Sequence, residues 1–170
     1  MLHIYTDGAC RVHNENTPGG WSIIIVNADD TLHYLDFGCE MDTTNNRMEL
    51  TAMIKALSYC RIYPGSVAIY SDSAYVVNGL TKGWVKSWIK KGWKTSKGTP
   101  VQNIDLWQKA YELYEMARAA NDVMLKHVAG HSGNQYNELA DTFATSAIDG
   151  RAEALANTLL QRSDKEGGTF

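Results

Sequence analysis

The chain has 170 residues, 44% of them hydrophobic and 21% charged, with a net charge of −3, a composition typical of one folded domain with its own core. Its longest strongly apolar run, residues 23–26, is too short to cross a bilayer, and its start lacks the basic and apolar regions of a signal peptide, so we expect no membrane partner. Three cysteines without C-x-x-C spacing predict neither a disulfide framework nor a zinc site, and we expect reduced thiols in a cytoplasmic monomer.

The N-terminal part of the chain predicts an antiparallel meander. Three short β-rich runs, at residues 2–6, 21–26 and 32–37, are separated by a polar loop and a turn. Asp7-Gly8-Ala9 is expected to close the first of these strands.

A helix is predicted over residues 43–60. Glu49 lies on a face of this helix that is otherwise small and apolar, formed with Ala52, Met53, Ala56 and Cys60. A carboxylate on a face that packs against a core is costly unless it is paired, hydrogen-bonded or bound to a cation. The alternative is a capping box, in which Asn46 is the N-cap and Glu49 reaches back to its backbone.

The rest of the chain alternates strands and helices. A strand at residues 67–71 followed by a short helix at 73–80 implies a right-handed crossover, which places this strand parallel to the first. Later elements are a helix at 103–119, a strand at 123–127 and a helix at 134–147. Residues 1–150 would thus form one domain. Residues 151–170 would add an amphipathic helix to residue 161 and a disordered polar tail from residue 163.

Residues 82–97 form a basic segment on an otherwise acidic chain. The segment contains no acidic residue, so it gives the molecule a local positive field despite the negative net charge. Its lysines and tryptophans are Lys82, Lys86, Lys90, Lys91, Lys94, Lys97, Trp84, Trp88 and Trp93.

Four carboxylates are predicted to converge at one edge of the sheet. Asp7 and Asp72 follow strands that should be parallel neighbours, so both would project from the edge where open α/β sheets bind ligands. Glu49 and Asp141 come from helices, at positions that face the core. These acids would repel one another unless cations intervened, and oxygen ligands without a cysteine or histidine cluster favour Mg²⁺ or Mn²⁺. Taken singly, Asp7 could be a turn residue, Asp72 a helix cap and Asp141 a solvated helix residue.

Several motifs together resemble the ribonuclease HI (type 1 ribonuclease H) family, in the family's order and over roughly residues 1–150. They are IYTDGAC at 4–10, TNNRMEL at 44–50, SDS at 71–73, GWKT at 92–95, NIDLW at 103–107, GHSGN at 130–134 and NELAD at 137–141.

The resemblance implies an α/β fold in which a mixed five-stranded sheet, three antiparallel strands and then two parallel ones, is flanked by helices. It implies an endonuclease that cuts the RNA strand of RNA–DNA hybrids. By motif position, Asp7, Glu49, Asp72 and Asp141 would bind metal, and His131 would be the mobile histidine of the last loop. Two Mg²⁺ ions, or Mn²⁺ as a substitute, would give products with 5′-phosphate and 3′-hydroxyl ends.

The resemblance also implies contacts to both strands of a hybrid. Asn45, Asn46 and the backbone around Cys10 would read the minor groove, and Thr44 and Asn103 would bind a DNA-strand phosphate. The basic segment at residues 82–97 resembles the family's basic protrusion. This protrusion would hold the DNA strand through Trp84, Lys86, Trp88, Lys90 and Lys91. Trp84 and Trp88, spaced i and i+4, could instead form a packed helix face.

The match has departures that concern affinity for substrate. Ala74 stands where related sequences commonly carry a glutamine that reads the minor groove, and Asp42 lies where some members have a basic residue. In the altered loop at residues 11–20, either Asn14 or Asn16 could take the family's asparagine contact.

Two other functions are compatible with parts of the pattern. One is an integrase-like or resolvase-like nuclease acting on DNA, which the motif at 44–50 and the basic protrusion disfavour. The other is a module that binds hybrids without cutting them. The loss of one of the four acids would have supported it, but all four are present.

Overall fold

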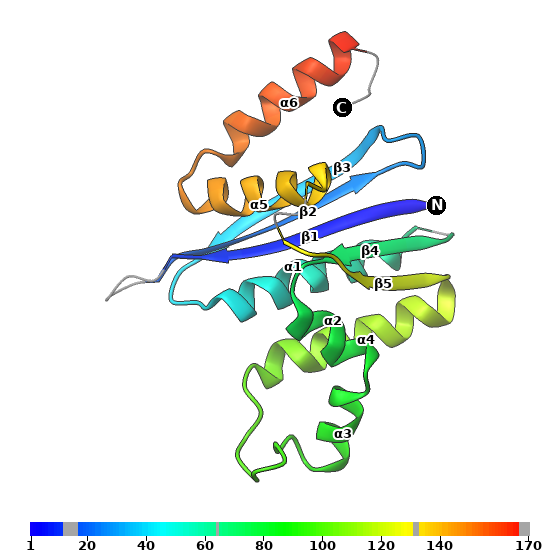
Figure 1. Cartoon of the computed structure of the whole chain (residues 1–170), viewed down its shortest axis with the longest axis vertical. Coiled ribbons are helices and arrows are strands. Elements are labelled where there is room, and N and C mark those ends of the chain that lie inside the picture. Colours follow the sequence, from blue (N-terminus) through cyan, green and yellow to red (C-terminus); the bar gives the residue numbers. More distant parts are fainter. Residues whose placement is uncertain (12–16, 64, 131–132, 167–170) are drawn as a thin grey trace.

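The computed structural model describes residues 1–11, 17–63, 65–130 and 133–166, the last five of them by their backbone alone (Figure 1). The strands are β1 Leu2–Cys10, β2 Gly19–Val26, β3 Leu32–Glu40, β4 Val67–Ser71 and β5 Val123–His127. The helices are α1 Asn45–Cys60, α2 Ala74–Thr81, α3 Trp84–Lys90, α4 Ile104–Ala120, α5 Gln135–Ile148 and α6 Ala152–Glu166.

The five strands form one mixed sheet in the order β3-β2-β1-β4-β5. The first three strands pair antiparallel, whereas β4 pairs parallel to both β1 and β5. This arrangement confirms the predicted fold class and the predicted parallel pairing of the first and fourth strands.

β1 is longer than the sequence predicted, and the difference matters for the site. Asp7 does not close the strand as a turn residue. It lies within β1 and is paired with Ser22 of β2, and this antiparallel pairing continues to Cys10. The parallel pairing with β4 ends earlier, at Thr6 and Ser71. The edge of β1 is therefore free of β4 from Asp7 onward.

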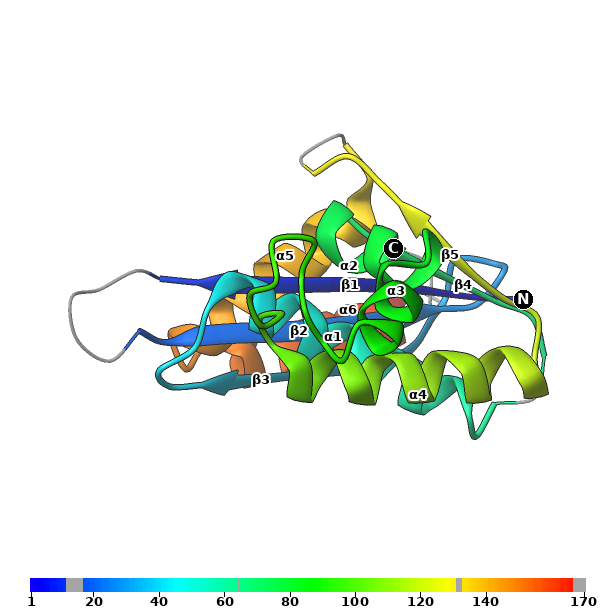
Figure 2. The same cartoon turned by 90° about the horizontal axis from the view of Figure 1, so that it is seen from below.

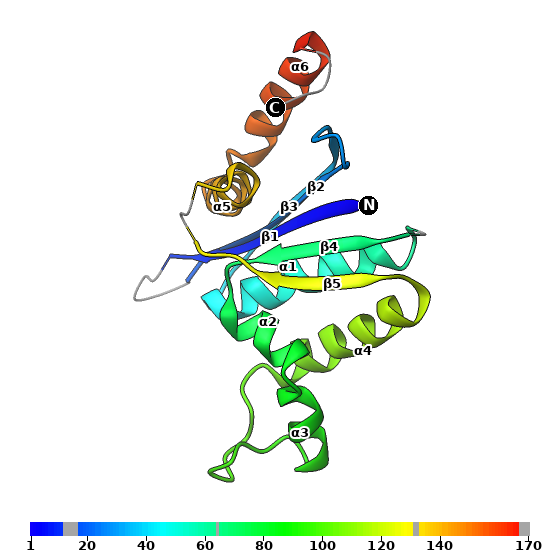
Figure 3. The same ribbon diagram turned by 45° about the vertical axis from the view of Figure 1, so that its right-hand side comes forward.

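Helices cover the sheet on both faces, and alternate residues of β1 enter two different cores. Leu2 and Ile4 pack into the larger core, on the face that carries α1 and α4, whereas Tyr5 packs on the opposite face with residues of α5. Figure 3 shows α5 and α6 on one side of the sheet and α1, α2 and α4 on the other, and the view from below shows α4 running lengthwise along that side (Figure 2).

Short polar residues cap the helices that carry or follow the acids. Thr44 is the N-cap of α1, since its hydroxyl accepts a hydrogen bond of 3.3 Å from the Arg47 N–H, so the predicted capping box with Asn46 as N-cap is wrong. Likewise, Ser73 caps α2 and Asn134 caps α5. The cap of α2 is thus a serine hydroxyl rather than the Asp72 carboxylate.

The C-terminal helix α6 extends to Glu166, past the predicted end at residue 161. Residues 163–166 contain neither glycine nor proline, so nothing in this polar run breaks a helix. The predicted disorder from residue 163 stays a prediction. The last residues of the predicted tail, 167–170, lie outside the described residues. None of the helices in the described part of the chain has the length and apolar character needed to cross a membrane.

Candidate active site

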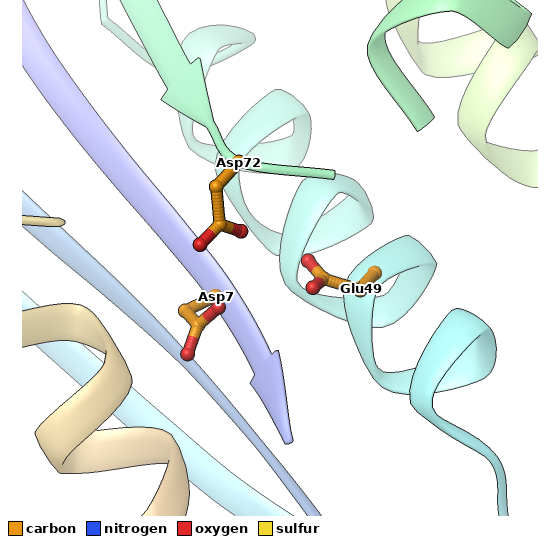
Figure 4. Close-up of side chains that lie close together, drawn as sticks. All are labelled: Asp7, Glu49 and Asp72. Carbon is orange, nitrogen blue, oxygen red and sulfur yellow. The ribbon is translucent and has the colours of Figure 1, made fainter. Parts of the chain in front are cut away.

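Asp7, Glu49 and Asp72 form a cluster at the end of β4. One carboxylate oxygen of each residue lies within 4.8 Å of the others, and Figure 4 shows the three side chains converging from β1, α1 and the residue that follows β4. Asp7 and Glu49 are each only 5% exposed, and Asp72 is partly buried. Three of the four acids predicted to converge therefore do so.

The strand pairing places the two aspartates beside each other. β4 leaves the sheet directly after Ser71, which pairs with Thr6, so Asp72 lies next to Asp7 at the point where the two strands separate. Two hydrogen bonds of 3.1 Å to the Asp72 carbonyl, from the Ala74 N–H and from His127 Nε2, hold this corner of the chain. Because Ser73 caps α2, the Asp72 carboxylate is left free of capping. Figure 4 shows it turned toward Asp7.

A glycine in β1 brings Glu49 to the cluster. A Cβ atom at Gly8 would overlap the Glu49 N and the Met48 carbonyl carbon and would lie 2.8 Å from the Glu49 Cα. Only glycine allows this close approach of α1 to β1. Glu49 then reaches past the open edge of β1, and its Oε2 is buried without a hydrogen-bond partner among the described residues.

Burial and mutual repulsion raise the pKa values of these acids. Desolvation, followed by the negative charges of Asp72 and Asp141, raises the pKa of Asp7 from 3.8 to about 8. Desolvation, and then the charge of Asp7, raises the pKa of Glu49 well above its ordinary value. The Gly8 N–H offsets part of both shifts. A divalent cation would remove this strain, and buried carboxylate oxygens, one of them unpaired, are the donors that a hard cation prefers.

Asp141 approaches the cluster from α5. It is partly buried rather than a solvated helix residue, and its charge contributes to the raised pKa of Asp7, although it is outside the group within 4.8 Å. Ser22 fixes the height of α5 above the sheet, because its buried hydroxyl donates a 2.7 Å hydrogen bond to the carbonyl of Ala140. Since Ser22 pairs with Asp7, this bond ties the residue before Asp141 to the strand beside Asp7. The sequence analysis did not single out Ser22.

His131 lies outside the described residues, as do Asn14 and Asn16 of the loop that follows β1. The described residue before His131 is nevertheless close to the acids. A Cβ atom on Gly130 would be 2.9 Å from Asp72 Oδ2, so the chain enters this loop directly against the cluster.

The residues predicted to contact the hybrid near the acids gather around the start of α1. Asn45 and Asn46 are exposed there, and Cys10 donates a 3.6 Å hydrogen bond from its Sγ to the carbonyl of Thr43, directly before the N-cap Thr44. The Arg47 side chain joins α1 to the start of α4, because its guanidinium donates a 3.4 Å hydrogen bond to Asn103 Oδ1.

Arg47 is a residue that the sequence analysis missed. Its guanidinium binds the Asp105 carboxylate through two hydrogen bonds of 2.9 and 3.1 Å, and this lowers the pKa of Asp105. The pair fixes the distance between the starts of α1 and α4. Arg47 thus links the start of α1, which Thr44 caps, to Asn103 at the start of α4.

α3 stands away from the sheet, and its two tryptophans differ (Figures 1 and 3). Trp88 packs edge-on against Trp107 of the large core, with ring centroids 5.4 Å apart, so it serves packing as the alternative interpretation stated. Trp84 is 37% exposed. The lysines of this element point to solvent, namely Lys86, Lys90 and Lys91. Ala74 and Asp42, the two departures, are exposed as well, so neither is held by the core.

Comparisons with known protein sequences all identify the ribonuclease H family. The family model described as RNase H matches residues 1–149. A protein of Hahella chejuensis named Ribonuclease H is 43% identical over 157 residues, covering 92% of this chain and 97% of the relative. A Ribonuclease H of Chlorobaculum parvum is 44% identical over 147 residues, covering 86% and 94%.

Solved structures agree in fold. A crystal structure of a type 1 RNase H with the type 2 active-site motif is 31% identical and has a TM-score of 0.72, covering 88% of this chain and 72% of that one. A foamy viral protease-reverse transcriptase in complex with an RNA/DNA hybrid has a TM-score of 0.76 at 24% identity. Its match covers 86% of this chain and 20% of the viral one, and it shows the shared fold alone.

Proposed function

This chain belongs to the ribonuclease H family and is a ribonuclease H, and on that premise we propose that its acid cluster uses two divalent cations to hydrolyse the RNA strand of RNA–DNA hybrids. The observation that carries the proposal is the meeting of three carboxylates from three separate elements, with one Glu49 oxygen buried and unpaired.

Asp7, Glu49 and Asp72 would hold the cations, with Asp141 as a further ligand. Their oxygen-only donor set suits Mg²⁺, with Mn²⁺ as a substitute. When bound, such ions supply an activated water and stabilise the leaving 3′ oxygen, so products would carry 5′-phosphate and 3′-hydroxyl ends. The protein itself contributes position, because strand pairing and the Gly8 contact hold the carboxylates on rigid elements before any substrate arrives.

We assign His131 to proton transfer or product release. The support for this role is its place in the chain, directly after Gly130, which lies against the Asp72 carboxylate. An imidazole titrates near neutral pH, so a histidine at this point of the chain would be able to accept and to give a proton during turnover.

The hybrid would lie across the start of α1. Asn45, Asn46 and the backbone at Cys10 would meet the minor groove, where the 2′-hydroxyls distinguish RNA from DNA. Thr44 and Asn103, joined through Arg47, would bind a DNA-strand phosphate. The DNA strand would continue onto α3, to Trp84, Lys86, Lys90 and Lys91, whereas Trp88 serves packing.

We also propose that the enzyme acts as a monomer in the cytoplasm. All four acids come from one chain, so a second copy is not needed to complete the site. Cys10, Cys39 and Cys60 are free thiols, which agrees with a reducing compartment.

A cleavage assay with three substrates tests the function. An RNA strand carrying a 5′ label is annealed to DNA or to RNA, and a labelled duplex DNA serves as the third substrate, each with and without Mg²⁺. We expect cleavage of the hybrid RNA alone, and only with the cation. Cleavage of duplex DNA would favour an integrase-like or resolvase-like nuclease, and binding without cleavage would favour a hybrid-binding module.

A further inference from the structure

One face of the sheet beside the acids carries aromatic and cationic side chains. α5 packs over β1, β2 and β3, whereas Figure 3 shows no described helix lying over β4 and β5 on that side. Because side chains alternate along a strand, Ile69 and Leu125 face the large core, and Tyr70 and Lys126 face the uncovered side. Tyr70 is partly buried and Lys126 is exposed.

These side chains form a row across three strands. Tyr5 pairs in register with Tyr70, and Tyr70 with Lys126. The Tyr5 and Tyr70 rings stack with centroids 4.7 Å apart and planes 12° from parallel, and the Lys126 ammonium is 5.5 Å from the Tyr70 ring centroid. A cation held over an aromatic face in this way keeps a preferred position.

Tyr70 is supported from a further direction. His3 stacks on its ring at 5.8 Å, and His3 Nδ1 shares a 3.1 Å hydrogen bond with the Tyr70 hydroxyl. The Tyr5 ring behind it contacts Tyr136 of α5 at 5.3 Å. Tyr70 is therefore a platform fixed before any ligand binds, and such fixing lowers the entropy cost of a contact.

The row lies one pleat away from the acid cluster. Tyr5 precedes Asp7 by two residues along β1, which is a spacing of about 6.6 Å, and Tyr70 precedes Asp72, the residue after β4, by two residues. In duplex DNA one nucleotide rises about 3.4 Å along the axis, so a nucleic-acid strand that runs along β1 would place the row about two nucleotides from the acids. A phosphate beside the acid cluster is repelled by it, and a nearby ammonium offsets that repulsion.

We propose that Tyr70 and Lys126 form a subsite for the RNA strand, one or two nucleotides from the cleaved linkage. Lys126 binds a backbone phosphate, and the part of the Tyr70 side chain that remains exposed contacts the adjoining ribose or base. This subsite rests on the proposed function, since it assumes that the acids hold an RNA phosphate.

The first test compares Lys126→Ala with the unaltered enzyme on a labelled hybrid. We expect the KM to rise roughly 3- to 10-fold with kcat nearly unchanged, and the salt dependence of binding to lose about one unit of slope. Lys126→Arg should restore both. Lys109→Ala is the matched control, because Lys109 is an exposed lysine on α4, paired with Glu112 at 3.3 Å, and its loss should change neither quantity.

The second test locates the contact on the strand. Single uncharged methylphosphonate linkages are introduced along the RNA strand and, in separate substrates, along the DNA strand. In the unaltered enzyme one linkage within two nucleotides of the cleaved one should raise KM, and in Lys126→Ala the same linkage should have no further effect. An unchanged KM and salt slope in Lys126→Ala, or a coupled linkage on the DNA strand, would overturn the subsite.

Failure of the subsite is distinguishable from failure of the proposed function. If the unaltered enzyme does not cut the hybrid with Mg²⁺, the proposed function is wrong. The subsite is then measured by binding alone, using fluorescence anisotropy of the hybrid in an Asp7→Asn background with and without Lys126→Ala. The expected weakening is again roughly 3- to 10-fold, and equal dissociation constants would count against it.

Discussion

Gly8→Ala tests how β1 and α1 together place Glu49. The added Cβ would lie 2.8 Å from the Glu49 Cα and closer still to the Glu49 N and the Met48 carbonyl carbon, whereas ordinary contact begins at 3.4 Å. All three neighbours are backbone atoms of α1, so no side-chain rotation relieves the overlap. The helix must move away from the strand, and Glu49 moves with it.

The size of the effect follows from that displacement. Restoring ordinary contact at the Glu49 Cα alone needs a shift of about 0.6 Å, and the closer atoms need more. A misplacement of about 1 Å costs on the order of 100-fold in rate, and overpacking costs about 1–3 kcal/mol of stability. We expect kcat on a hybrid to fall roughly 30- to 100-fold. Tm should fall by about 2–4 °C for each kcal/mol lost.

Steady-state cleavage of a labelled hybrid measures kcat, and circular dichroism measures Tm. Gly79→Ala is the matched control, since its Cβ would overlap Trp107 Cη2 and lie 2.6 Å from Cζ3 and 2.9 Å from Cζ2 in the large core, away from the acids. It should lose similar stability and keep kcat. Unaltered kcat and Tm in Gly8→Ala would refute the close-contact argument. Equal losses of kcat in both variants would show that stability, rather than the placement of Glu49, controls the rate.

Three further predictions concern pH, the basic protrusion and α5. Without metal, the free energy of unfolding should fall as the pH rises from about 4 to about 8, because native Asp7, with its pKa raised to about 8, keeps a proton that the unfolded chain releases. Asp7→Asn should flatten this fall in urea titrations, and a stability that rises over the same interval would contradict the raised pKa. Replacing the exposed lysines of the basic protrusion by alanine should raise the KM for hybrid and weaken its salt dependence; these lysines are Lys86, Lys90 and Lys91. An unchanged slope of affinity against salt concentration would mean that they bind no phosphate. Ser22→Ala should weaken the apparent Mg²⁺ affinity roughly 3- to 10-fold, because it removes the 2.7 Å bond that holds α5 at Ala140. Ser22→Thr should recover part of it, and an unchanged Mg²⁺ titration in Ser22→Ala would argue against this role.

Much of the fold follows from local pattern. The alternation of strands and helices after residue 67 requires crossovers, and these lead to the parallel neighbours β1, β4 and β5. Glu49 was recognisable as a site residue because an acid on an apolar helical face needs a partner. Asp72 was recognisable because the strand ends beside it.

Other features depend on tertiary pairing and were not predictable locally. Asp7-Gly8 resembles a turn, but antiparallel pairing with β2 carries β1 through it to Cys10. Several capping residues stand in a row before α1, and sequence alone did not identify Thr44 as the one that bonds Arg47. Ser22 became visible only once the register set it opposite Asp7.

The central claim is that the acid cluster cleaves the RNA strand with bound cations, and Asp7→Asn tests it most directly. The measurement is Mg²⁺-dependent cleavage of a labelled hybrid together with the dissociation constant for the same hybrid. The account predicts that cleavage falls by roughly 1,000-fold or more while the dissociation constant stays within about threefold. Cleavage at the unaltered rate in Asp7→Asn would contradict it.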